Sequence, residues 1–473
     1  MAKTLIELDP VTRVSGLMSL GVQIDQGRIT DAQSGGMQYR GMDRMLQGRP
    51  PLDAMRLTSR TCGICSVAHT IASTMALEMA MGVTPDFNGE LIRAITLGFD
   101  TIQNNIRQIY QLAIPDYANI CGIPPLFTNA PEEETDFRLP KNVNDLLVSH
   151  YQASIGFSRS AHKAVATIAG KAPHNHGIFV GGVTTNFDID MYSIVKSILH
   201  GLTEFVRDVM IPDVAILMEY YPEYRFLGHG SGNYMSYGYF AFLPERFWVT
   251  KPGLLLDGAF AELNPDLITE SIRHTWLKAE QELLRPLDEP PTLDFGKPGA
   301  YSWVDAPRYA GKVVETGPMA GLIVSGDYSG DTGALGRIMA RALFTQMVCE
   351  KMRLMLEYVR MQPANQQQWQ VPETGEGHAL TGAMRGGLGH WIRIENQKIA
   401  RYTILPPSNW NMSPKSGDGQ HGACEQALIG TPIEDPKKTK VIVGRIVRSF
   451  DPCLNCAAHV VSDRAEPFTF QIA

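Results

Sequence analysis

Two Cys-x-x-Cys pairs near opposite ends of the chain constrain its fold more than any other feature. The first pair is Cys62 and Cys65, and the second is Cys453 and Cys456. This spacing lets two thiolates turn toward one metal ion, and the pairs of a local zinc ribbon usually lie only about 15–20 residues apart. If these two distant pairs meet, nearly the whole protein must fold around one four-sulfur site.

Other interpretations of a Cys-x-x-Cys pair are a redox dithiol, half of a structural zinc site, an iron–sulfur ligand pair or two buried cysteines. A dithiol would explain one pair and leave the other idle. Structural zinc normally staples small modules, and a chain of 473 residues does not need such a staple. Spacing alone therefore favours a shared metal site, with zinc as the default metal.

The residues around both pairs resemble segments of the large subunit of nickel–iron hydrogenases. The first pair lies in Arg-Thr-Cys-Gly-Ile-Cys, which His69 follows, and the second lies in Asp-Pro-Cys-Leu-Asn-Cys-Ala-Ala-His, which ends at His459. The resemblance extends to segments 9–13, 39–43, 385–391 and 406–411. Because all of them occur in the family's order, the chain is identified as a member of that family.

The resemblance implies a nickel–iron centre bound by all four thiolates. Soft thiolates favour nickel, low-valent iron, copper(I) or zinc, and only the resemblance selects among these metals. By that resemblance Cys62 and Cys453 are terminal on nickel, whereas Cys65 and Cys456 also bridge to an iron that carries carbon monoxide and a pair of cyanide ligands. Dihydrogen is a very weak acid, so its cleavage needs a metal to accept the electron pair and a base to accept the proton. The thiolate of Cys453 would be that base.

Charged and polar positions around the metals follow from the same resemblance. His69 would hydrogen-bond the bridging sulfur, although without the resemblance a core histidine would be the default interpretation. The family's groups over the open metal position correspond to Arg385, Asp116 and Asp451. Arg385 would be held close to substrate by a carboxylate, which suits its rigid fork of donors.

Four further residues correspond to positions near the iron and near a magnesium ion. By resemblance, Pro407 and Ser408 line the carbonyl and cyanide ligands, with the Ser408 hydroxyl donating to a cyanide. Asp43 and His459 match the ligands of the magnesium site, which their distance in sequence would not suggest by itself.

The chain departs from the family at three of these segments. Many relatives carry a glutamate at the position of Ser15, where it accepts the proton from the terminal cysteine. A hydroxyl can pass a proton along a hydrogen-bonded chain but cannot hold it as a carboxylate can, so the proton exit is open to question. Asp43 replaces the commoner glutamate, and Met384 stands where many relatives have proline before the arginine.

The apolar patterns predict an α+β fold that is predominantly helical, with a bundle of long helices and small peripheral sheets, as in the hydrogenase large subunit. Helical patterns cover 66–81, a stretch from Asn88 onward, 143–170, 189–219, 260–284 and 332–361. Strand patterns cover 390–394, 399–404 and 441–447, and residues 17–38 read as a hairpin. We expect one interwoven catalytic domain over 1–459, followed by an extension, 460–473, of the kind that the family cleaves during maturation.

Composition and cysteine use indicate the partners. The remaining cysteines, Cys121, Cys349 and Cys424, do not form an iron–sulfur ligand set, so an iron–sulfur small subunit is implied as electron acceptor. A net charge of −7 gives no sign of nucleic-acid binding, and only 19% charged residues leave room for a large interface. By resemblance, a maturation protease and nickel-insertion factors act on the chain, and heterodimers assemble further.

No secretory signal and no transmembrane run is visible in the sequence. We expect a cytoplasmic chain or one attached to a membrane through partners, and export with a signal-bearing small subunit is equally compatible. The expected reaction is reversible H2 cleavage, with uptake as the working direction. The alternatives are a slow H2 sensor, a scaffold like the related subunit of respiratory complex I, and a zinc-stapled binding protein.

Overall fold

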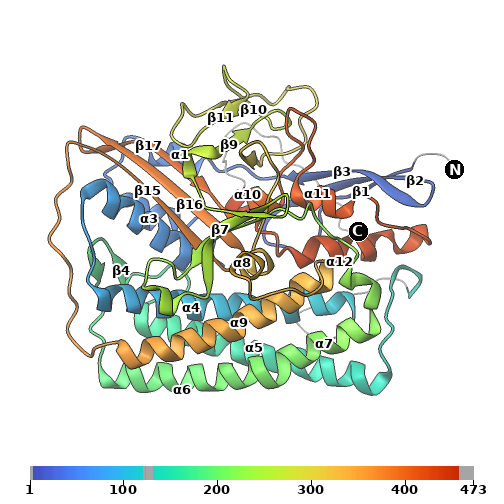
Figure 1. The fold of residues 1–473 in the computed structure, drawn as a ribbon, viewed down its shortest axis with the longest axis horizontal. Coiled ribbons are helices and arrows are strands. Elements are labelled where there is room, and N and C mark those ends of the chain that lie inside the picture. The colour runs from blue at the N-terminus through green and yellow to red at the C-terminus, as the bar shows by residue number, and fades with distance from the viewer. Residues whose placement is uncertain (1–3, 121–122, 124–131, 458–473) are drawn as a thin grey trace.

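A layer of long helices forms one side of the molecule (Figure 1), in a computed structural model that describes residues 4–120, 123 and 132–457. The layer consists of α4 (Phe87–Arg107), α5 (Lys141–Ala169), α6 (Ile189–Phe205), α7 (Ile211–Tyr220) and α9 (Ala334–Tyr358). α5 packs against α4 and α6, and α9 packs against α4, α6 and α7. The predicted bundle of long helices is therefore confirmed. Cys121, His459 and the extension 460–473 lie outside the described residues.

The other helices and small sheets cover this layer. The helices are α1 (Met42–Leu46), α2 (Asp53–Thr58), α3 (Ser66–Met81), α8 (Pro318–Ser325), α10 (Pro407–Asn411), α11 (Ala423–Leu428), α12 (Thr439–Ser449) and α13 (Leu454–Ala457). Two three-stranded antiparallel sheets matter for the site: β1 (Thr4–Leu8), β2 (Met18–Asp25) and β3 (Arg28–Gly36) in one, and β15 (Thr374–Ala383), β16 (Gly386–Glu395) and β17 (Lys398–Leu405) in the other. The predicted hairpin is β2–β3.

The other strands form further small sheets. One sheet has the order β14 (Glu315–Thr316), β6 (Tyr234–Tyr239), β7 (Thr250–Leu256) and β8 (Ala259–Ala261), and another has the order β11 (Leu283–Leu284), β9 (Ile268–Ser271) and β13 (Ala306–Tyr309). β10 (Leu277–Lys278) pairs with β12 (Thr292–Leu293), and β4 (Ile178–Phe179) with β5 (Gly182–Val183). No helix within the described residues is long and apolar enough to cross a membrane.

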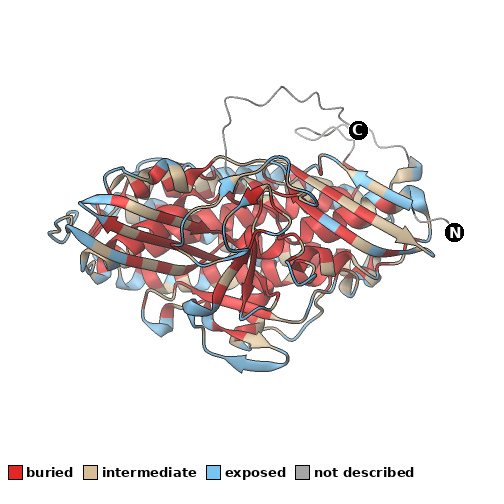
Figure 2. Ribbon diagram, turned by 90° about the horizontal axis from the view of Figure 1, so that it is seen from above, coloured by how far each residue is buried: buried red, intermediate tan, exposed pale blue. Residues whose placement is uncertain are grey.

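The main hydrophobic core runs through the centre of the molecule, where Figure 2 shows almost continuous burial. Helix α4 is buried along nearly its whole length, between α3, α5 and α9. The side chain of Asp86 caps this helix by accepting a hydrogen bond from the backbone N of Gly89. The predicted cap, Asn88, is wrong by two residues; its side chain instead binds the backbone of Arg360.

Two predicted elements are wrong in type. Residues 260–284 form short strands, not a helix: Asn264 caps a single turn at Pro265, after which β9 pairs with β11 and β13. Residues 441–447 were expected to form a strand because they are rich in β-branched side chains, but they lie in helix α12. That helix buries Val443, Ile446 and Val447, so burial of a stripe at helical spacing outweighs the local preference for a strand.

The first and last described segments lie side by side. Ser15 forms a parallel bridge with Cys453: its backbone N donates to the carbonyl of Pro452 at 3.1 Å, and its carbonyl accepts from Leu454 N at 2.6 Å. The next residue, Gly16, has φ +91°, and a Cβ there would lie 2.6 Å from the backbone N of Asn455. Only glycine allows so close an approach with this backbone conformation.

We expect Gly16→Ala to separate the two segments. A left-handed conformation costs a side chain about 1–2 kcal/mol, and the contact with Asn455 adds to this cost. Gly48→Ala is the matched control, because Gly48 has φ +75° and nothing within 4 Å of its added Cβ. Denaturant unfolding should show a larger loss of stability for Gly16→Ala, and thiol alkylation should reach Cys453 in that variant. Equal stability losses and equal protection of Cys453 in both variants would contradict the close packing.

Candidate metal centre

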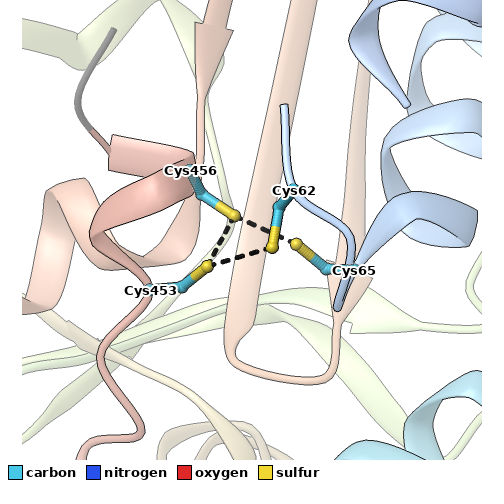
Figure 3. Close-up of side chains that lie close together, drawn as sticks. All are labelled: Cys62, Cys65, Cys453 and Cys456. Carbon is cyan, nitrogen blue, oxygen red and sulfur yellow. Dashed lines mark hydrogen bonds between the residues drawn. The ribbon is translucent and has the colours of Figure 1, made fainter. Parts of the chain in front are cut away.

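The four cysteines of the two pairs meet in one buried cluster (Figure 3), in which all Sγ atoms lie within 4.8 Å of one another. The Sγ atom of Cys453 is 3.3 Å from that of Cys62 and 2.9 Å from that of Cys456. The Sγ atoms of Cys65 and Cys456 are 3.0 Å apart. Among the described residues, no other group of three or more Cys, His, Asp or Glu side chains brings its ligand atoms this close together. The distant pairs therefore meet, as the sequence indicated.

Local structure holds each pair in place. Cys65 is the last residue before α3, and Cys453 directly precedes α13. A positive φ of +57° at Asp451 turns the chain into the second pair. The guanidinium of Arg40 joins the two segments, because it donates hydrogen bonds to the carbonyl oxygens of Thr61 and Asn455.

Contact between the thiols separates their pKa values. The pKa of Cys62 falls well below its ordinary value because the neighbouring thiols, Cys453 above all, hydrogen-bond to its thiolate. The pKa of Cys456 rises because burial, and then hydrogen bonding with Cys453, favours its neutral thiol. A cation that replaces the protons removes this conflict. Two thiolates that are each about 2.3 Å from one ion lie at most about twice that distance apart. The Sγ atoms of this cluster all lie within 4.8 Å of one another, which is comparable. The donor set therefore fits a soft metal.

Arg385 and Asp451 form a buried network beside the sulfur atoms. Arg385 lines the same small pocket as Cys65, Cys453 and Cys456. Its Nε donates to the Asp451 carbonyl at 2.9 Å, and its Nη2 lies 3.1 Å from Asp451 Oδ1. Burial alone would lower the pKa of Arg385, but Asp451 and the thiols raise it well above its ordinary value. Its Nη1 has no hydrogen-bond partner in the described part of the chain, so one donor stays available.

Asn104 is a member of this network that the sequence did not reveal. Its Oδ1 accepts from Arg385 Nη2 at 2.8 Å, and its Nδ2 donates to Asp451 Oδ2 at 2.9 Å. Asn104 is a buried residue of α4. It comes close to the cysteines only because of the way that this helix packs in the fold. Neither a motif nor a spacing in the sequence singles it out.

Asp116, which the resemblance groups with Arg385, makes its ion pairs with other residues. Its carboxylate binds Arg13 and, through both oxygens at 2.6 Å, Arg448. Burial would raise the pKa of Asp116, but the charges of Arg13 and Arg448 hold it below its ordinary value. No ion pair within the described residues joins Asp116 to Arg385. A place for Asp116 over the open metal position stays a prediction.

His69 lies on the first turn of α3 and lines the pocket beside the sulfur atoms. Its Nδ1 is 3.0 Å from Nε2 of His390, and Nδ1 of His390 is 2.7 Å from the hydroxyl of Tyr402. Burial lowers the pKa of His69 to about 4. Its hydrogen bond to Cys65 stays a prediction. Neither His390 nor Tyr402 has a role in the sequence analysis, where the one signal is that His390 lies in the matched segment 385–391.

Two serines contact Cys453. Ser408 and Pro407 begin α10 and line the pocket, and Ser408 Oγ accepts a hydrogen bond from Cys453 N at 2.9 Å. Ser15 Oγ lies 3.6 Å from Cys453 Sγ and accepts from Asn455 Nδ2 at 3.1 Å. Ser15, which stands where many relatives have a glutamate, is thus in contact with Cys453, the cysteine that we expect to accept the proton.

Asp43 lies in a group of acidic side chains with Glu270 and Asp305. Desolvation, and then the charge of Asp305, raises the pKa of Asp43 to about 7. Desolvation and the charges of Asp305 and Asp43 raise the pKa of Glu270 well above its ordinary value. The Oδ1 atoms of Asp43 and Asp305 lack hydrogen-bond partners within the described residues. Unpaired carboxylate oxygens suit a hard cation such as magnesium. His459, the other predicted ligand, lies outside the described residues.

Comparison with known proteins gives consistent results along the whole chain. The sequence model of a family described as nickel-dependent hydrogenase matches residues 40–124, 121–332 and 327–459. The chain is 31% identical to the periplasmic [NiFeSe] hydrogenase large subunit of Desulfomicrobium baculatum, over 97% of this chain and 95% of that protein. It is 30% identical to the hydrogenase-2 large chain of Escherichia coli, over 96% and 97%.

Solved structures agree with these matches. A structure of the H2-activated [NiFeSe] hydrogenase from D. baculatum superposes with a TM-score of 0.92 at 31% identity, covering 97% of this chain and 100% of that one. The reduced Ni-Fe-Se hydrogenase from Desulfovibrio vulgaris Hildenborough superposes with a TM-score of 0.93 at 30% identity, with the same coverage. The fold predicted from the sequence is therefore confirmed.

We expect Cys453→Ser to lose most of its nickel, because a serine hydroxyl stays neutral at a pH where a metal-bound thiol is deprotonated. Cys349→Ala is the matched control: Cys349 is also buried but lies outside the cluster. Elemental analysis of the purified variants measures nickel per chain. A full complement of nickel in Cys453→Ser, or an equal loss in Cys349→Ala, would contradict the assignment.

Proposed function

The chain belongs to the nickel-dependent hydrogenase family as its catalytic large subunit, and we propose that it cleaves H2 reversibly into protons and electrons, with uptake as its working direction. The observation that carries the proposal is the buried cluster of four thiols drawn from both ends of a chain in this family. The direction has support from a relative in Rhodobacter capsulatus, called an uptake hydrogenase large subunit, which is 28% identical over 98% of this chain.

The cysteines divide into two roles in this proposal. Cys62 and Cys453 would hold nickel as terminal ligands, whereas Cys65 and Cys456 would be shared between nickel and iron. When bound, the nickel–iron centre supplies the Lewis acid that polarises H2 and takes up its electron pair. The Cys453 thiolate takes up the proton, and Ser15 is in contact with its Sγ to receive it.

Ser408 would donate a hydrogen bond to a cyanide ligand of the iron, and Arg385 would supply a hydrogen-bond donor on the substrate side of the centre. Support comes from Arg385 Nη1, which is buried without a partner, and from the Ser408 hydroxyl, which accepts from Cys453 N and so keeps its own proton to donate. Pro407 completes the lining and carries no N–H of its own. Asp451 keeps Arg385 in place through its carboxylate and its carbonyl.

In the same proposal, Asp43 and His459 bind a magnesium ion. The acidic group around Asp43 supports this, because its unpaired oxygens gain ligands or water partners when a hard cation is present.

Electrons leave through an iron–sulfur small subunit. Cys349 and Cys424 are buried singly, and no second thiol cluster exists in the described part of the chain. Nickel-insertion factors and a protease that removes 460–473 complete the assembly, and heterodimers associate further. We place the enzyme in the cytoplasm or at a membrane through its partners.

The decisive experiment is infrared spectroscopy of the purified enzyme with its small subunit, combined with metal analysis and an H2-oxidation assay. We expect nickel and magnesium in equal amounts, iron in excess of both because the clusters of the small subunit also contain it, absorption bands of metal-bound carbonyl and cyanide, and electron transfer from H2 to a dye. Zinc in place of nickel, without those bands, would instead indicate a binding protein. The bands without steady turnover would indicate an H2 sensor.

Ser15→Glu tests the proton exit. A carboxylate at this position can hold the proton that leaves Cys453, and general acid–base groups contribute about 10²–10⁴-fold to rates. We therefore expect faster exchange between D2 and water protons, by about 10-fold or more, at unchanged metal content. Ser15→Ala, which removes the hydroxyl without adding a carboxylate, is the control and should not show the gain. Identical exchange rates for Ser15→Glu and the unaltered enzyme would contradict this role.

A further inference from the structure

Arg341, a buried arginine of α9, contacts both the segment that carries Arg385 and the ion-pair partner of Arg385. Its Nη1 donates a hydrogen bond to the carbonyl of Met384, the residue directly before Arg385, at 2.9 Å. The same nitrogen lies 3.3 Å from Asp451 Oδ2. Arg341 is 2% exposed, so water hardly competes for these contacts. None of the functional roles described above uses Arg341.

Helix packing fixes the position of Arg341 itself. Asn105 on α4 accepts a hydrogen bond from Arg341 Nη1 at 2.8 Å, and its own Nδ2 donates to Thr345 Oγ1 at 2.9 Å. Thr345 lies about one turn after Arg341 on α9, so Asn105 is bonded to two successive turns of that helix. Helices α4 and α9 also pack on each other. Arg341 therefore approaches Arg385 from a pair of packed helices and not from a loop.

The carboxylate of Asp451 is divided between two arginines. Its Oδ1 lies 3.1 Å from Nη2 of Arg385, whereas its Oδ2 faces Arg341 and accepts from Asn104 Nδ2 at 2.9 Å. Because both oxygens are held, the carboxylate cannot turn away from Arg385 without losing its contacts with Arg341 and Asn104. Burial lowers the pKa of Arg341 to about 10, so the guanidinium is still charged at neutral pH. One negative charge thus faces two positive charges.

We propose that Arg341 is a positioning residue that fixes Arg385 beside the thiol cluster, through the carbonyl of Met384 and the carboxylate of Asp451. The first contact holds the backbone at Arg385, and the second holds its side chain. Arg385 lines the pocket beside the cysteines, and its Nη1 has no partner within the described residues. A shift of Arg385 would therefore move a free donor relative to the sulfur atoms. The effect on the reaction rests on the proposed nickel–iron centre, whereas the coupling of Arg341 to Asp451 is a property of the chain itself.

Denaturant unfolding of the full-length chain measures this coupling. Arg341→Met and Asp451→Asn each remove the same ion pair, so their shifts in the unfolding midpoint should not add. The double variant should be more stable than the sum of the two single losses predicts. Arg93→Met is the matched control: Arg93 pairs with a buried carboxylate, that of Glu78, at 2.6 Å, and donates to backbone carbonyl oxygens. Its midpoint shift should add to that of Asp451→Asn.

The second measurement is the infrared spectrum and the H2 turnover of the metal-loaded enzyme with its small subunit. Arg341→Met should shift the carbonyl and cyanide bands and lower kcat by about 10-fold or more, because misplacing a group at an active site can cost about 10²-fold. Arg93→Met should leave the bands in place. Arg341→Lys should restore most of the spectrum and of kcat, since Nη1 alone makes the contacts and an ammonium group offers three donors in its place.

Additive midpoint shifts for Arg341→Met and Asp451→Asn would overturn the inference, as would unchanged bands in an Arg341→Met enzyme with its full nickel content. If Arg341→Met does not fold, the milder Arg341→Gln, which is neutral but keeps a donor, takes its place with the same outcomes. A protein that shows no such bands even when unaltered, but whose midpoint shifts are not additive, would refute the hydrogenase proposal and leave the coupling of Arg341 to Asp451 standing.

Discussion

The backbone pairing between the chain's first and last described segments is the constraint on which the site depends. Two hydrogen bonds of Ser15 fix the residues on either side of Cys453, and Gly16 lets the segments approach closely. Without this contact, the segment that carries Cys453 and Cys456 would lose its backbone pairing with the N-terminal part of the chain. The Arg40 guanidinium adds a third connection, between Thr61 and Asn455. A metal bound by all four sulfur atoms would complete the closure.

Charge is balanced around the cluster by a buried network and not by solvent. Thiolates in a low-dielectric interior need nearby cations, and Arg385 supplies one beside the sulfur atoms. Asp451 then compensates Arg385 and Arg341, with N–O distances of 3.1 Å and 3.3 Å. Removing one partner of such a buried pair typically costs about 3–5 kcal/mol, so loss of any one of these residues would destabilise the fold. In the proposed function Arg385 and Asp451 would serve catalysis as well as stability.

Features that depend on residue spacing or on a rare combination of motifs could be predicted from the sequence. The two cysteine pairs, the β2–β3 hairpin and the long helices all carry local signals that survive in the fold. Prediction failed where packing decides: α12 is helical because it buries Val443, Ile446 and Val447 together, although β-branched residues favour strands. Asn104 and Tyr402 join the site only through helix packing and strand register, and neither leaves a trace in a single sequence.

The contacts of Ser15 show how its hydroxyl can take part in proton exit. Both of its hydrogen-bond partners donate to it: Cys453 through its thiol and Asn455 through its amide nitrogen. An amide nitrogen cannot accept a proton, so the route cannot continue through that nitrogen. A proton that reaches Ser15 from Cys453 must displace the hydroxyl's own proton toward a third acceptor. In the proposed function Ser15 would therefore be a relay that needs an ordered water or another acceptor beyond it, whereas a glutamate at this position would hold the proton without one.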